Sequence, residues 1–88
     1  MQRRFLEENR RKLYELVLQP IDVLMVATAS RKSLTTVYNI LKGRTKVNYK
    51  TNNIGFLLDT SARKRIEEIN QLAEEVEEYS QLTFLSDD

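Results

Sequence analysis

Residues 23–44 read VLMVATASRKSLTTVYNILKGR. In the second half of this stretch, Ile40 and Leu41 follow Val37 by three and four residues, which places all three on one face of a helix. In the first half, suppose that Val23 is the first position of a helix-turn-helix; Ala27 is then the fifth, where only a small side chain lets the two helices approach closely. The stretch therefore predicts two short helices that cross near Ala27 and are joined by a sharp turn.

The ends of the second helix carry residues suited to helix termini. Ser33 follows the predicted turn of residues 30–32, and a serine oxygen can accept a hydrogen bond from a free backbone N–H in the first helical turn. Gly43 follows the last inward residue and suits the left-handed conformation that ends many helices. We therefore expect a helix-turn-helix over residues 22–42, with its second helix at residues 33–42.

The outward face of this second helix carries groups that can hydrogen-bond, touch a thymine methyl group or meet a phosphate. These residues are Leu34, Thr35, Thr36, Tyr38, Asn39 and Lys42. The run SLTTVYNILKGRT resembles the recognition helix of Cro/phage-repressor and LacI-type helix-turn-helix proteins, in which Ser-x-x-Thr-Val opens the helix and Gly-Arg or Gly-Lys follows it. Two turn residues depart from that pattern, because Arg31 replaces the usual glycine and Lys32 an apolar residue.

The resemblance implies an all-α domain that reads the major groove of double-stranded DNA with helix 33–42. It implies base contacts from Leu34, Thr35, Tyr38 and Asn39, and an asparagine can pair bidentately with adenine. Cations and hydroxyls beside the helix would bind phosphates and set its position on the duplex. We expect these phosphate contacts from Arg31, Lys32, Ser33, Thr36, Lys42, Arg44, Lys46, Tyr49 and Lys50.

The charge distribution also suits a polyanionic partner. Residues 1–50 hold 11 Lys/Arg and 4 Asp/Glu, a balance of +7, whereas residues 51–88 hold 3 and 9, a balance of −6, giving the net +1. The basic half is the one that contains the predicted helix-turn-helix. This coincidence favours nucleic acid as the partner at that end of the chain.

The composition argues against an enzyme. The chain has no cysteine and no histidine, which removes disulfides, thiolate metal sites and the commonest general base. Adjacent glutamates such as Glu74 and Glu75 diverge on a helix rather than converge on a ligand. We therefore expect no catalysis, no metal and no cofactor. Because no apolar run is long enough to cross a bilayer, we also expect no membrane span and a cytoplasmic protein.

The remaining segments complete a predicted single domain of four or five helices over residues 1–81. Apolar spacing predicts a helix at residues 2–18, and Pro20 suits the first position of the next helix. A long amphipathic helix is expected at residues 60–81, and residues 82–88 should form a frayed acidic tail.

Residues 44–58 have two interpretations. We favour a loop followed by a short helix, and the alternative is a β-hairpin wing reversed at residues 51–53. In either case the expected core consists of Leu13, Leu16, Val17, Leu24, Ala27, Val37, Ile40, Leu41, Ile54, Leu58, Ile66 and Ile69.

The long helix suggests how the protein could assemble. Ile69, Leu72, Val76 and Tyr79 recur at heptad-like spacing and could form the seam of a homodimer, although the same stripe could pack on its own domain. The expected function is sequence-specific binding of double-stranded DNA, by a small transcriptional regulator or phage-type repressor. The alternative is a helical interaction or assembly protein, such as a phage accessory protein or antitoxin, in which the helix-turn-helix is only scaffold.

Overall fold

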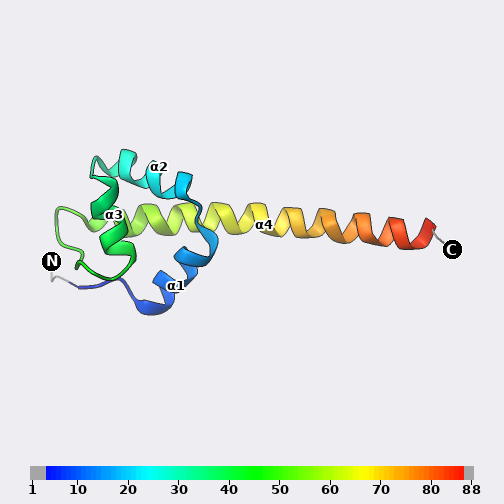
Figure 1. The fold of residues 1–88 in the computed structure, drawn as a ribbon, viewed down its shortest axis with the longest axis horizontal. Helices are drawn as coiled ribbons and strands as arrows, with labels where there is room; N and C mark the ends of the chain where they lie inside the picture. The colour runs from blue at the N-terminus through cyan, green and yellow to red at the C-terminus, as the bar shows by residue number, and fades with distance from the viewer. Residues whose placement is uncertain (1–3, 87–88) are drawn as a thin grey trace.

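The computed structural model describes the backbone of residues 4–86 and the side chains of residues 4–81. It confirms the expected all-α fold. Within these residues the four helices are α1 (Glu8–Val17), α2 (Pro20–Ser30), α3 (Leu34–Leu41) and α4 (Asn52–Ser86). The three short helices pack against the first part of α4, and the rest of α4 projects as a rod (Figure 1). We call residues 4–65 the head, and residues 66–86 the stalk.

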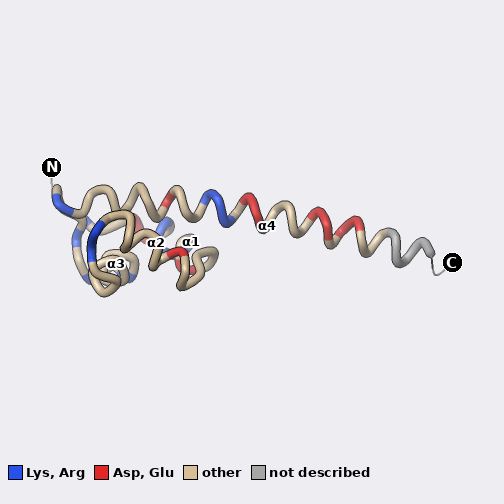
Figure 2. The backbone as a smooth tube through the Cα atoms, turned by 90° about the horizontal axis from the view of Figure 1, so that it is seen from above, with Lys and Arg blue, Asp and Glu red and all other residues tan. Residues whose placement is uncertain are grey.

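Viewed from above, all three short helices lie on the same side of α4 (Figure 2). The molecule is consequently elongated, with principal extents of 61 × 24 × 17 Å. The core of the head contains residues from every helix and one from the loop before α4. These residues are Tyr14, Val23, Val26, Ala27, Val37, Ile40, Leu41, Val47, Ile54, Leu58 and Ala62.

α1 is shorter than predicted, because residues 4–7 precede it as a non-helical segment in which Arg4 and Val47 exchange backbone hydrogen bonds of 3.3 and 2.7 Å. The predicted core positions Leu13 and Leu16 are wrong: their side chains are 42% and 83% exposed. Tyr14 is buried instead, and its hydroxyl donates to Asp59 Oδ1 at 3.1 Å. The inward position of α1 is thus filled by Tyr14, which ends in a polar hydroxyl. The spacing of purely apolar residues therefore predicted the neighbouring face of α1 as the buried one.

α2 begins at Pro20, as predicted. Its start is stabilised by a hydrogen bond in which the Gln19 N–H donates to Asp22 Oδ2 at 2.8 Å. Ala27 is buried as expected, but Leu24 is 47% exposed and its assignment to the core was wrong. The reason is that α2 is apolar on nearly every side. Only its packing against α3 and α4 determines that Val23 and Val26 face inward.

α4 begins at Asn52 rather than at residue 60. The turn before it sets this start: the Asn48 N–H donates to Thr51 Oγ1 at 3.0 Å, and the Thr51 N–H donates to the Asn48 carbonyl at 3.0 Å. The short helix expected near residue 54 is therefore the first part of α4, and no β-hairpin wing forms in this segment. At the other end, α4 continues through residues 82–86 of the predicted frayed tail, and residues 87–88 lie outside the described chain.

The core ends near residue 65 of α4. Ile54 and Leu58 are fully buried, Ile66 is half-buried, and Ile69 is 45% exposed, so the prediction of Ile69 as a core residue was wrong. Val17 is partly buried against the core rather than within it. Helical spacing continues across this border without a change, so the sequence does not indicate where the short helices stop covering α4.

Candidate nucleic-acid interface

The turn between α2 and α3 adopts the conformation that usually calls for glycine. Arg31 has φ 57° and ψ 36°, in the left-handed region, at a cost of about 1 kcal/mol relative to glycine. The Lys32 N–H donates to the Ala27 carbonyl at 3.1 Å, which closes the end of α2. Ala27 itself is 5% exposed, beneath this turn. The departure from the usual turn sequence therefore does not prevent a sharp turn between α2 and α3.

The two ends of α3 are closed by different residues. At its start, Ser33 Oγ accepts a hydrogen bond from the Thr36 N–H at 3.1 Å and lies 2.8 Å from Thr36 Oγ1. One hydroxyl proton is used between these two oxygens, so the second remains free to donate to a phosphate. At its end, Gly43 has φ 75°, the left-handed conformation predicted for it.

Arg11 has a structural role that the sequence did not reveal. Its Nε donates to the Leu6 carbonyl at 3.1 Å, and its Nη1 donates to the Lys42 carbonyl at the end of α3 at 3.2 Å. A Cβ added at Gly43 would overlap this guanidinium group. The arginine run of α1 thus contributes a capping group for α3, and a charged residue on an inward face gives no signal in a hydrophobic pattern.

The outward ridge of α3 is narrower than predicted. Thr35 is exposed and Asn39 is half-buried one turn later, on the side of α3 opposite to the buried Val37 and Ile40. Leu34, 41% exposed, lies at the start of the helix. Tyr38 does not belong to this ridge, because it packs against the core and lines a cleft beside α1. The geometry thus favours Thr35, Asn39 and Leu34 over Tyr38 as groups that could reach a base.

The predicted phosphate-contacting residues form two groups, one at each end of α3. Arg31 and Lys32 lie in the turn before it, next to Ser33 and Thr36. The second group lies in the loop after α3, and its exposed members are Arg44, Lys46, Tyr49 and Lys50. Lys42 differs from the rest, because its Nζ lies 3.4 Å from a Glu15 carboxylate oxygen. This ion pair reduces the positive charge that Lys42 can present.

Two exposed aromatic rings accompany these cations. Lys46 Nζ lies 5.4 Å from the centre of the Phe5 ring, and Lys50 Nζ lies 5.7 Å from that of Tyr49. Basic residues gather at the end of the head opposite to the stalk, whereas acidic residues dominate the stalk (Figure 2). The separation of charge seen along the sequence is therefore also a separation in space.

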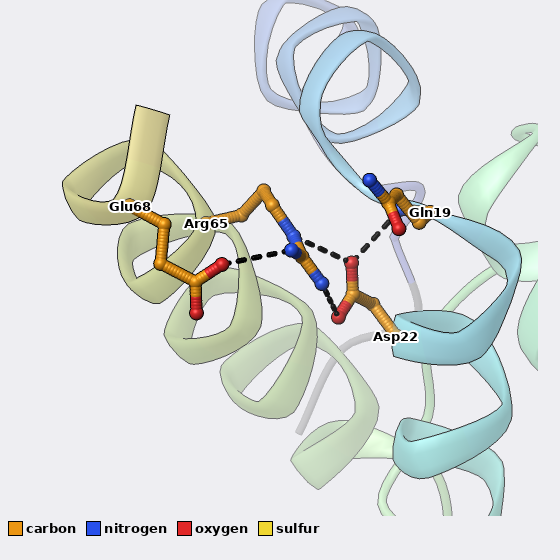
Figure 3. Close-up of polar contacts among 4 residues, drawn as sticks. All are labelled: Gln19, Asp22, Arg65 and Glu68. Carbon is orange, nitrogen blue, oxygen red and sulfur yellow. Dashed lines mark hydrogen bonds and ion pairs between the residues drawn. The ribbon is translucent and has the colours of Figure 1, made fainter. Parts of the chain in front are cut away.

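An ion pair attaches the first helix of the motif to α4 (Figure 3). Arg65 donates to Asp22 through Nη2 at 2.8 Å and through Nε at 3.1 Å, and its Nη1 donates to Glu68 at 2.8 Å. Burial would raise the pKa of Asp22, but the hydrogen bonds from Arg65 and from the Gln19 backbone outweigh it and lower that pKa. Sequence spacing missed this pair, because its partners are 43 residues apart.

The residues predicted as a dimer seam lie along the stalk, and nothing in the described part of the chain covers them. Ile69, Leu72, Val76 and Tyr79 are 45%, 58%, 64% and 74% exposed. Among the described helices, none alone has the length and apolar composition of a membrane span; only α1 and α2 taken together have both, and they are bent by 117°. Comparison with protein-family models, curated proteins and solved structures found no match to this chain.

Proposed function

We propose that this protein binds double-stranded DNA in a sequence-specific manner, as a small transcriptional regulator without enzymatic activity. The observation that carries the proposal is the arrangement around α3: an outward ridge of Thr35 and Asn39, with basic side chains before and after the helix. A ridge of this kind can read base edges while the flanking cations hold the backbone.

The dimensions of α3 support this reading. Its 8 residues make a helix about 12 Å long, which is close to the width of the major groove. Cations at the two ends of such a helix can therefore reach the phosphates on both sides of the groove. The stalk supports the same orientation, because its six glutamates are repelled by DNA and it leaves the head at the opposite end from these cations.

Selection of bound duplexes from a random pool, followed by titration of the enriched sequence, tests the proposal. Asn39→Ala should weaken binding to the selected site by about 1–3 kcal/mol and leave binding to random duplex nearly unchanged. Lys46→Ala should weaken binding to all duplexes and reduce the slope of log affinity against log salt by about one.

Lys64→Ala is the matched control, since it removes one positive charge from α4 instead of from the loop after α3, and it should change neither quantity much. If Asn39→Ala and Lys46→Ala act identically on selected and random DNA, base reading by α3 is wrong. If no duplex binds even at about 50 mM salt, the helix-turn-helix is scaffold and a helical interaction protein becomes the better explanation.

A further inference from the structure

One face of α4 continues from the head into the stalk. Ile54, Leu58 and Ala62 on this face are buried by the short helices. Further along, the exposed Ile69, Leu72, Val76 and Tyr79 recur at steps of three and four residues. Residues at such steps lie on the same side of a helix, so the bare apolar stripe of the stalk extends the side that the head already covers.

We propose that a second copy of this chain covers the stripe, with the two stalks packed antiparallel and the two heads at opposite ends. The inference does not depend on DNA binding, because it concerns only the stalk. The stalk is about 30 Å of helix without a packing partner in the described chain, and most of the stability of helices in proteins comes from packing of an apolar face rather than from helix propensity.

The stripe has the composition of a helix–helix seam. Ile69 and Val76 occupy one core position of a heptad, and Leu72 and Tyr79 occupy the other. The small residues Ala73 and Ser80 lie along one flank of this seam. Most of the acidic side chains lie on the far side of the helix, at positions 67, 74, 77 and 78. A copy of the same stalk could therefore approach without burying them.

The position of the head excludes a parallel pair. Packed helices lie about 8–10 Å apart, and each head adds at least one further helix, about 10 Å thick, on the side that the partner would occupy. Only about 6 Å of α4 separates Arg65, at the edge of the head, from Ile69, so the stalks cannot diverge enough to admit two heads. An antiparallel pair reduces this overlap to the ends of the stalks, because in the register described below only residues 84–86 of each stalk lie beside the head of the other copy, opposite residues 62–64.

The antiparallel arrangement has a preferred register. All four apolar residues are matched when Ile69 faces Tyr79 of the copy and Leu72 faces Val76 of the copy. In this register Glu75 approaches its own counterpart across the two-fold axis, which opposes association at low salt. Added salt should therefore tighten the dimer, whereas it should weaken binding to DNA. The two proposals can consequently fail separately.

Cysteine cross-linking tests orientation and register together, because the chain has no native cysteine. Two single variants, Ile69→Cys and a size-tagged Tyr79→Cys, are oxidised separately and as a mixture. Both changes lie in the stalk, so the head stays folded. In the proposed register residues 69 and 79 of different copies are neighbours, while the two copies of residue 69 are about 15 Å apart along the axis, too far for a disulfide.

The expected result is a mixed disulfide in the mixture and little cross-linking of either variant alone. Light scattering should show a dimer for the wild type at tens of micromolar and a monomer for Val76→Glu. Cross-linking of each variant to itself would overturn the proposal in favour of a parallel pair. A wild-type monomer with no cross-linking would also overturn it, and would indicate a different partner for the stripe.

Discussion

The Asp22 carboxylate lies between two helices and is held from both. The Gln19 N–H of the α2 start donates to Oδ2, and the Arg65 guanidinium of α4 donates to both oxygens. The side chain of Asp22 is almost fully buried, whereas Arg65 is partly open to solvent. Loss of this carboxylate would leave Arg65 with the more exposed Glu68 as its carboxylate partner, and it would remove the acceptor of the Gln19 N–H at the start of α2. Two separate contributions to the stability of the protein therefore depend on Asp22.

Asp22→Asn should lower the free energy of unfolding by about 2 kcal/mol at pH 7. Because the pKa of Asp22 is lowered in the folded state, its contribution is complete above the ordinary aspartate pKa of about 3.9 and is lost as the pH falls through the folded value. The difference between wild type and variant should therefore shrink below pH 4. Urea titrations at pH 7 and pH 3 measure it.

Glu68→Gln is the control for this change. Glu68 binds the same arginine but its side chain is 59% exposed, so its removal should cost less than about 0.5 kcal/mol at pH 7. An equal loss from both variants would show that the burial of Asp22 is unimportant. A difference for Asp22→Asn that stays constant down to pH 3 would contradict the lowered pKa.

At the scale of elements, contact between α2 and α3 depends on Ala27. Its methyl group lies in the core where the two helices approach, and it is 5% exposed. Ala27→Leu should force the helices apart and lower stability by about 1–3 kcal/mol through overpacking. Thermal unfolding followed by circular dichroism measures this loss. Ala29→Leu, on an exposed position of α2, is the matched control and should have little effect.

The elements also show how far the sequence alone could predict the fold. The turn, the Ser33 cap, the Gly43 terminus and the inward face of α3 were predicted correctly, because each depends on residues close together in the chain. The start of α4 was not, because a turn closed by Thr51 determines it. For α1 and α2, the buried face depends partly on contacts with α4 more than 30 residues away, which no local pattern contains.

In the candidate site, too, the residues placed by local spacing were predicted correctly, and those placed by contacts with another helix were not. Thr35, Asn39 and the flanking cations lie where local helical spacing put them. Tyr38 turns toward the core and Lys42 pairs with Glu15, because α1 packs against that flank of α3. Helical spacing could separate the inward face of α3 from its outward face. It could not show which part of the outward face another helix approaches.

At the scale of the whole molecule, the distance between the basic end and the acidic stalk should keep the negative charge of the stalk from affecting DNA binding at physiological salt. A variant with glutamine at positions 74, 75, 77 and 78 should bind DNA within about twofold of wild type at 150 mM salt, since the Debye length is then only about 8 Å. Near 10 mM salt, its affinity should exceed that of wild type. Fluorescence anisotropy at the two salt concentrations measures both. A large gain at 150 mM salt would place the stalk beside the duplex.

A single unbroken helix joins head and stalk, so the molecule rotates as one elongated body. Spinning about the long axis is then faster than end-over-end tumbling. Peptide N–H bonds point nearly along their helix axis, so those of α4 lie parallel to the long axis, while those of α3 run across it (Figure 1). Nitrogen-15 relaxation should therefore give α4 amides a longer effective correlation time than α3 amides, even with the same internal motion in both helices.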